Sequence, residues 1–244
     1  MNYSDITIND PNIVKRFLQR SRFTDAVKLY PCQAGNFKVL DFGGGDGELC
    51  LRLSDIDRGS SYICYEPSED MHQQAKSNIP DKNKISLINS LESIATNSID
   101  IIYSLEVFEH LPEQESVDAL ESIYSILKPG GSLIIGVPNE LFISAMYKGI
   151  FRMYRRFGEF DAQLNNILKC VIGRPPQKRP VGEISPGKQY HFHHLGFDHR
   201  LLSERLKEKF VNYKRIFTPF WFLGVWGSPE IYYVVQKKTN KLIN

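Results

Sequence analysis

The sequence has no apolar run long enough to cross a membrane and no signal-peptide core at its beginning. The longest apolar stretches lie near residues 133–137 and 220–226, far short of the roughly 20 residues that a transmembrane helix needs. The first 30 residues are charged, whereas a signal peptide carries a central apolar segment. These absences argue against a membrane-spanning or secreted protein, and we expect a cytoplasmic one.

The sequence contains few cysteines, and their spacing shows no pairs of the kind that bind zinc or form disulfide frameworks. None of the cysteines forms a CxxC pair, and each stands in or beside an apolar run. Zinc ribbons and disulfide frameworks both need paired spacing, so the sequence argues against them. This usage is typical of reduced, buried thiols. The residues are Cys32, Cys50, Cys64 and Cys170.

The net charge is also small. Thirty Lys and Arg residues against 28 Asp and Glu give +2 at pH 7, which is too little to imply an obligatory nucleic-acid or anionic-membrane partner. With 42% hydrophobic and 24% charged residues, the composition indicates a globular protein rather than a disordered chain or a coiled coil. A chain of 244 residues can bury a core without a disulfide or a structural metal.

Short apolar runs alternate with amphipathic stretches along the chain, which indicates strands alternating with helices. The predicted strands are 38–42, 62–66, 84–89, 99–104, 132–137, 213–218 and 231–236. The predicted helices are 10–29, 46–54, 68–78, 112–127 and 199–210. This order predicts a parallel sheet covered on both faces, closed by a hairpin-like antiparallel pair, with ligands bound where the parallel strands end.

One segment departs from this alternation. Residues 141–190 carry a net charge of +6, which leaves −4 on the remainder of the chain. At 100° per residue, residues 142–157 form an amphipathic helix, and we expect the segment to pack over the ligand edge of the sheet. Its apolar arc contains Phe142, Met146, Ile150, Met153 and Phe157. The basic side chains on the opposite side are Lys148, Arg152, Arg155 and Arg156.

The chain therefore divides into four predicted segments. Residues 1–35 form an N-terminal helical segment, and residues 36–139 form the core that binds the ligand. Residues 140–190 are an insertion of helices and loops on the substrate side. Residues 191–244 complete the sheet of the core.

A glycine-rich loop follows the first predicted strand. The sequence DFGGGDG at 41–47 lets the backbone turn sharply and approach a ligand closely. Glu66 ends the second strand, where a carboxylate can accept hydrogen bonds from a ribose diol. A dinucleotide fingerprint needs Gly or Ala at its last position, and this chain has Glu48 or Cys50 there, so the loop does not match that fingerprint.

Four successive motifs resemble those of the class I S-adenosylmethionine-dependent methyltransferases of the type 11/23 kind, similar to quinone and glycan O-methyltransferases. The motifs are VLDFGGGDG (39–47), YEPSEDM (65–71), SIDIIYSLEVFEHL (98–111) and LKPGGSLIIGVPN (127–139). The resemblance implies an α/β, Rossmann-like, seven-stranded and mostly parallel sheet. Helices would cover both faces, the last strand would be antiparallel, and a helical insertion would follow strand 5.

The resemblance also implies S-adenosyl-L-methionine as cofactor and a set of residues around it. The family usually carries an Asp after its third strand, where this chain has Asn89-Ser90-Leu91, so Ser90 and the backbone near Leu91 would face the adenine. The implied cofactor residues are Asp41, Gly43, Gly44, Gly45, Gly47, Glu66, Pro67, Met71, Ser90, Leu91, Ser104 and Leu105.

Acids and histidines gather after the fourth predicted strand. Glu106, Glu109 and His110 can share one face of a helical turn, either for packing and capping, as a general base, or as ligands of Mg, Mn or Zn. Four of the six histidines fall within 191–199 and can complete such a site. Asp198 is predicted to cap the next helix and His199 to be exposed. The catalytic candidates are His110, Glu106 and His193, and the metal candidates are Glu106, Glu109, His110 and His194.

Three hypotheses remain for the function and its methyl acceptor. The first is O-methylation of a small-molecule, sugar or lipid-linked acceptor, with peripheral membrane contact through 141–158. The second is a metal-dependent RNA 3′-end 2′-O-methyltransferase, which the low net charge disfavours. The third is a catalytically silent protein that only binds the cofactor. The oligomeric state has no signature in the sequence.

Overall fold

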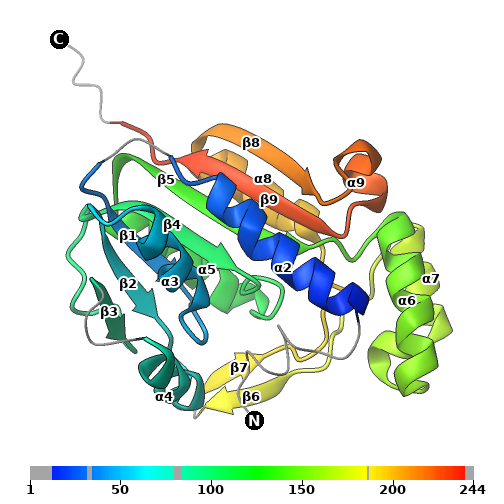
Figure 1. Cartoon of the computed structure of the whole chain (residues 1–244). Helices are drawn as coiled ribbons and strands as arrows, with labels where there is room; N and C mark the ends of the chain where they lie inside the picture. Colours follow the sequence, from blue (N-terminus) through cyan, green and yellow to red (C-terminus); the bar gives the residue numbers. More distant parts are fainter. Residues whose placement is uncertain (1–12, 32–34, 80–83, 186, 240–244) are drawn as a thin grey trace.

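Seven strands form one twisted, mostly parallel sheet in the order β3-β2-β1-β4-β5-β9-β8 (Figure 1). The structure is a computed structural model that describes residues 13–31, 35–79, 84–185 and 187–239. The strands are β1 Lys38–Phe42, β2 Ser61–Tyr65, β3 Ile85–Ile88, β4 Ile99–Leu105, β5 Leu127–Pro138, β8 Val211–Thr218 and β9 Glu230–Gln236. All seven predicted strands are confirmed, and β9 runs antiparallel to both of its neighbours, as predicted.

The largest shift in a strand boundary is at β5, which begins five residues before its predicted start. The sequence predicts a helix to residue 127 and a strand from residue 132, with Pro129-Gly130-Gly131 between them. Instead Gly130, at φ 79°, lets the chain bulge, so that Leu127 pairs with Ile99 before the regular register resumes at Ser132.

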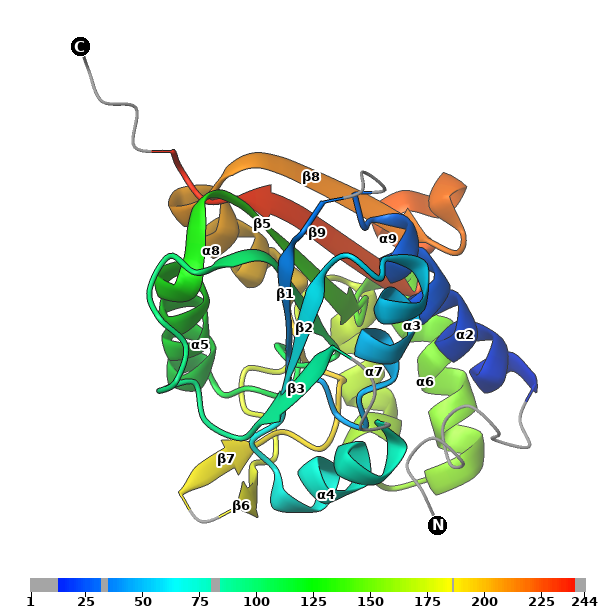
Figure 2. The same cartoon turned by 60° about the vertical axis from the view of Figure 1, so that its left-hand side comes forward.

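Helices cover both faces of this sheet (Figures 1 and 2). On one face, α2 and α3 bury Ala26, Leu49 and Leu53 against the sheet. On the other, α5 and α8 bury Leu120, Ile123, Leu202 and Leu206. These helices are α2 Ile13–Lys28, α3 Glu48–Ile56, α5 Glu113–Ile126 and α8 His199–Lys209, while α4 Glu69–Asn78 lies beside the carboxyl ends of β2 and β3.

The insertion after β5 contains two helices and a small hairpin. Its elements are α6 Phe142–Arg156, η1 Phe160–Ala162, α7 Leu164–Val171, β6 Gly182–Ser185 and β7 Lys188–Tyr190. The sequence predicted α6 but neither α7 nor the hairpin, whose first strand lies within a Pro- and Gly-rich stretch. Between β8 and β9, an aromatic turn forms η2 Trp221–Leu223 and α9 Gly224–Gly227.

α6 does not bury its whole apolar arc, as an ordinary amphipathic surface helix would. Lys148 and Arg152 point inward and bind the buried carboxylate of Glu140, at 3.0 and 2.7 Å. Met146 and Ile150, on the apolar arc, are exposed instead. Phe142 and Met153, from the same arc, pack on the small core cluster around Ile167 and Cys170, so the arc is only partly buried.

The described cysteines Cys50, Cys64 and Cys170 are free and buried, as predicted, while Cys32 lies outside the described residues. Within the described ranges, no helix has the length and apolar character that a membrane span would require. The four segment boundaries stay predictions.

The start of α8 confirms one capping prediction and corrects another. Asp198 Oδ1 accepts a hydrogen bond from the Arg200 amide at 3.0 Å and thereby caps the helix. His199, expected to be exposed, is fully buried, because its Nδ1 contacts the Tyr233 hydroxyl at 3.0 Å. Burial lowers the pKa of His199 to about 4, so this imidazole is neutral at pH 7.

The Asp198 cap predicts a measurable loss of stability. Asp198→Ala leaves a helix-terminal amide without its acceptor and should lower the free energy of unfolding by about 1 kcal/mol. Urea denaturation followed by circular dichroism measures this change. Glu208→Ala, at an exposed position of the same helix, should change it by less than about 0.5 kcal/mol. Equal losses in the two variants would contradict the capping role.

Candidate active site

The glycine loop is fixed to the end of β2 by backbone hydrogen bonds. The amides of Gly43 and Gly44 both donate to the Tyr65 carbonyl at 2.9 Å. Gly43, Gly45 and Gly47 have φ values of 75°, 55° and 82°, a left-handed conformation that side chains rarely adopt. The loop therefore keeps a tight bend whose backbone is open to a ligand at the carboxyl edge of the sheet.

Gly44 is required for a different reason, namely space. A Cβ built there would lie 2.6 Å from Cys64 Sγ and 3.0 Å from Asp41 Oδ2. Burial, with the nearby Glu66 and Asp46, raises the pKa of Asp41 to about 8. At neutral pH Asp41 is thus largely protonated beneath the loop rather than an additional negative charge.

Glu66 connects the second strand to the glycine loop. Its Oε2 accepts from the Gly45 amide at 2.9 Å, and its Oε1 accepts from the Ser68 amide at 2.8 Å. A carboxylate oxygen has two lone pairs, so each can also accept from a sugar hydroxyl. The residue predicted to bind ribose is therefore held rigidly next to the bend.

The other predicted cofactor residues border the same edge with different degrees of order. The methyl carbon of Met71 would lie 3.6 Å from a Cβ built on Gly45, so Met71 adjoins the loop. The buried Ser104 hydroxyl has no hydrogen-bond partner in the described structure. Ser90 is exposed and accepts from the Glu92 amide, while Leu91 packs on the core. Pro67 and Leu105, both half-buried, directly follow Glu66 and Ser104.

The turn after β4 brings acidic and imidazole groups together next to that loop. One donor atom from each of Glu109, His110 and His194 lies within 4.8 Å of the others. The two Nε2 atoms of His110 and His194 are 3.2 Å apart, and Glu109 Oε1 is 3.8 Å from His110 Nε2. Three of the four predicted metal candidates therefore converge.

The orientation of His110 is set by the segment that contains the other histidines. Its Nδ1 lies 2.7 Å from the His191 carbonyl, an acceptor, so Nδ1 carries the proton of the neutral ring. Tyr190 stacks on the imidazole at 4.4 Å between ring centroids. Burial lowers the pKa of His110 to about 4, which leaves Nε2 as an unprotonated ligand or base at pH 7.

Glu109 is the least satisfied group of the cluster. It is fully buried, and both of its carboxylate oxygens lack a hydrogen-bond partner in the described part of the chain. Burial raises the pKa of Glu109 to about 8. Because a buried carboxylate is costly unless it is paired, this donor set fits a divalent cation.

Glu106 and His193 lie outside this cluster. Glu106 forms an ion pair with Arg22 Nη1 at 2.8 Å, and Arg22 also contacts Glu230 at 3.2 Å. His193 turns its Nδ1 toward the buried Asp161 Oδ1, at 3.4 Å. Their predicted catalytic roles, and a metal role for Glu106, stay predictions.

Sequence reasoning missed Arg179, which holds the cluster together. One of its guanidinium nitrogens donates to the carbonyls of Glu109, at 2.7 Å, and His193. Arg179 lies in the Pro- and Gly-rich stretch, where no periodicity marked it. Its position depends on hydrogen bonds to two carbonyls, those of Glu109 and His193, which no local sequence pattern reveals.

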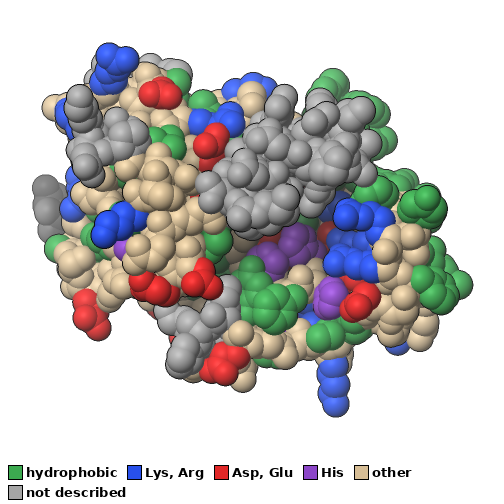
Figure 3. All heavy atoms as spheres, turned by 60° about the horizontal axis from the view of Figure 1, so that its bottom comes forward, with side chains coloured by type: hydrophobic (Ala, Val, Ile, Leu, Met, Phe, Trp, Pro, Cys, Tyr) green, Lys and Arg blue, Asp and Glu red, His purple; other side chains and the backbone are tan. Residues whose placement is uncertain are grey.

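Figure 3 shows the surface at this edge. Histidine side chains lie in a hollow, with basic side chains on one side and a hydrophobic group on another. A Cβ built on Gly43 would lie 2.5 Å from Val107 Cγ2, so the turn that contains Glu109 packs directly on the glycine loop. The two sites are therefore neighbours.

Comparisons with known proteins agree with this arrangement. Residues 40–135 match the family model described as "Methyltransferase domain". This segment of the chain is therefore similar to the domain of class I S-adenosylmethionine-dependent methyltransferases. A curated relative, an "uncharacterized methyltransferase" of Oceanobacillus iheyensis, is 34% identical over 101 residues, covering 41% of this chain and 46% of that protein. The match thus spans about half the length of this relative.

Solved methyltransferase structures share the fold. One from Mesorhizobium loti has a TM-score of 0.54 at 12% identity, covering 87% of this chain and 96% of that chain. One from Aquifex aeolicus has a TM-score of 0.54 at 14% identity, covering 97% and 94%. At such identities the likeness extends to the fold alone.

Glu66 provides a test of the cofactor site. In Glu66→Gln only one oxygen remains to accept from two backbone amides, and the charge is lost. The affinity for S-adenosylhomocysteine should fall at least about tenfold, as measured by titration calorimetry. Glu69→Gln, at an exposed position of α4, should bind as the parent does. An unchanged affinity in Glu66→Gln would refute the assigned role.

Glu109 provides a test of the acid–histidine cluster. In the metal-free fold this carboxyl keeps its proton up to about pH 8, whereas in the unfolded chain it loses it near 4.5. The folded state therefore binds more protons between these values, so stability falls as the pH rises through that interval. In chelator-treated samples, Glu109→Gln should remove part of this fall in thermal midpoint. Parallel midpoint-against-pH curves for parent and variant would contradict the assignment.

Proposed function

We propose that this protein transfers the methyl group of S-adenosyl-L-methionine to a hydroxyl oxygen of a small-molecule, sugar or lipid-linked acceptor. The observation that carries the proposal is the convergence of Glu109, His110 and His194 directly beside the glycine loop. Such a set suits an acceptor whose oxygen must lose a proton as it is methylated. The cytoplasmic location stays a prediction.

The cofactor itself supplies the reactive group. The sulfonium methyl is electrophilic, and its transfer in line to a nucleophile neutralises charge, so alignment provides most of the rate. The glycine loop and Glu66 would hold the nucleoside and methionine parts. Because Val107 packs on Gly43, an acceptor in the hollow would lie next to the cofactor.

A hydroxyl acceptor also needs help in losing its proton. We propose that Glu109, His110 and His194 hold a divalent ion for this purpose. Their donor atoms, separated by 3.2 Å between the two Nε2 atoms and 3.8 Å between Glu109 Oε1 and His110 Nε2, are close enough that one small ion could contact all three residues. A carboxylate with two imidazoles suits Zn and accepts Mn or Mg less specifically. Such an ion would lower the pKa of a coordinated hydroxyl.

An RNA 3′-end acceptor is the alternative that the same cluster permits, because vicinal hydroxyls of a terminal ribose can also chelate an ion. The exposed cations of the insertion favour it, while the net charge of +2 does not. A catalytically silent protein is the second alternative, and any methyl transfer would eliminate it.

The decisive experiment is a screen with radiolabelled cofactor against glycan, lipid, quinone and RNA fractions, with and without chelator. We expect chelator-sensitive labelling of a non-RNA fraction. Glu109→Gln and His110→Ala should each reduce it at least about tenfold, the lower limit seen when a partner of a metal ligand is lost. Glu121→Gln, on the outer side of α5 where it contacts Lys209, is the control.

The outcomes separate the mechanisms. Loss of activity in His110→Ala alone, with chelator and Glu109→Gln without effect, would replace the metal role by a general-base role for His110. Labelling confined to RNA would replace the acceptor class. Retained S-adenosylhomocysteine affinity in both variants shows that the cofactor site is intact.

A further inference from the structure

The outward faces of α6 and α7, together with the η2–α9 turn, expose apolar side chains in unusual density. We name this the outer apolar surface and define it as the exposed side chains within residues 143–157, 164–172 and 220–226. Tyr154 is 90% exposed, Phe157 86% and Trp221 76%, and Ile150, Leu168 and Phe222 are each more than half exposed. Monomeric soluble proteins rarely expose a contiguous apolar area of this kind without a partner.

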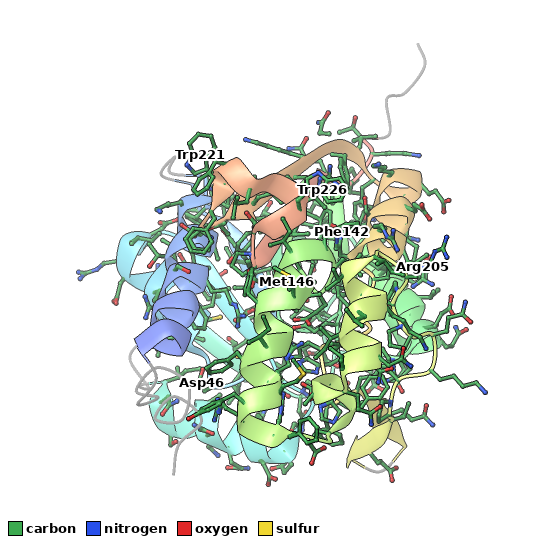
Figure 4. All side chains as sticks on the ribbon, turned by 90° about the vertical axis from the view of Figure 1, so that its right-hand side faces the viewer. Asp46, Phe142, Met146, Arg205, Trp221 and Trp226 are labelled. Carbon is green, nitrogen blue, oxygen red and sulfur yellow. The ribbon has the colours of Figure 1, made fainter. Side chains whose placement is uncertain are left out.

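These residues form one continuous surface. The rings of Phe142 on α6 and Trp226 on α9 are in contact at 4.6 Å. The Tyr147 hydroxyl donates to the Gly227 carbonyl, which fixes the turn against the helix. Figure 4 faces this surface and shows Phe142, Met146 and Trp226 side by side, with Trp221 at the outer end of the turn.

The helix cannot bury its apolar side by rotating. Its inner side holds Lys148 and Arg152 on Glu140, and Arg152 and Arg156 on Asp161, both acids being fully buried. Turning α6 over would leave these carboxylates without counter-charges, which is strongly unfavourable. The apolar side therefore stays outward in the isolated protein.

The charge of the surface has one sign. Neither α6, nor α7, nor residues 219–228 contains an acidic residue. Exposed cations adjoin the apolar side chains at Arg155, whose guanidinium lies 5.5 Å from the Phe151 ring centroid, and at Lys169. The one exposed acid between the helices, Glu159, lies 4.0 Å from His193 Nε2.

We propose that the outer apolar surface binds an anionic lipid bilayer. Trp, Tyr and Phe favour the boundary between headgroups and acyl chains, and Arg and Lys pair there with lipid phosphates. An amphipathic helix lying in the plane of that boundary exposes the same combination. A second copy of the chain fits less well, because a two-fold contact would place these cations against one another without an intervening acid.

Vesicle co-sedimentation of the full chain tests the proposal, and it needs neither cofactor nor acceptor. Vesicles of phosphatidylcholine alone are compared with vesicles that also contain phosphatidylglycerol, at about 0.1 M salt. The parent should sediment with the anionic vesicles. The double variant Ile150→Glu/Tyr154→Glu should bind at least about tenfold more weakly, because two apolar contacts are lost and two anions are added. Leu201→Glu, a 54% exposed leucine on α8, is the matched control and should bind as the parent does.

Three results would overturn the proposal. One is the absence of sedimentation with anionic vesicles, and another is equal sedimentation of parent and double variant. The third is a dimer, measured by light scattering, that the double variant dissociates while no form binds vesicles. Unchanged thermal midpoint and S-adenosylhomocysteine affinity show that the variants fold, so loss of binding is not confused with failure of the methyl-transfer proposal.

Discussion

The burial of carboxylates along one edge of the sheet is the constraint that organises this molecule. Five acids, Asp41, Glu66, Glu106, Glu109 and Glu140, lie at or shortly after the ends of parallel strands, and Glu230 begins the antiparallel β9 at the same edge. All but the half-buried Glu106 are almost inaccessible to water. Each needs its own compensation. Backbone amides donate hydrogen bonds to Glu66, whereas Asp41 and Glu109 are protonated. Arg22 forms ion pairs with Glu106 and Glu230, and Lys148 on α6 forms one with Glu140. Neighbouring acids of similar depth thus reach three different chemical states.

The sequence could predict those parts of this edge that depend on short segments. The strands, the glycine loop and Glu66 follow from local periodicity and from residues within one strand–helix unit. The ion pairs that Arg22 forms with Glu106 and with Glu230 could not be predicted, because their members are far apart in the chain. Arg22 and Glu230 are separated by 208 residues. The burial of His199 likewise depends on Tyr233, 34 residues later. Charge pairing across such separations leaves no periodic pattern.

The orientation of α6 shows that a correct local pattern does not by itself determine how a helix packs. The heptad-like arc of apolar residues is present, and the helix has the predicted boundaries to within one residue. The pairing of Glu140 with Lys148 and Arg152 fixes its orientation, because leaving a buried carboxylate without counter-charges is strongly unfavourable. A buried acid at the end of a strand can therefore reverse the usual assignment of inner and outer helix faces.

Two consecutive residues at the end of β5 serve different neighbours. Asn139 donates its amide hydrogens to the carbonyls of Val225 and Ser228, while Glu140 holds the cationic side of α6. The aromatic turn and the helix are thereby attached to a single short anchor that continues a central strand. The turn and the helix therefore keep a fixed position relative to β5. A bilayer bound to the outer apolar surface would lie at a fixed distance and tilt from the end of β4. The backbone of the protein would thus set the distance between the membrane surface and the candidate active site.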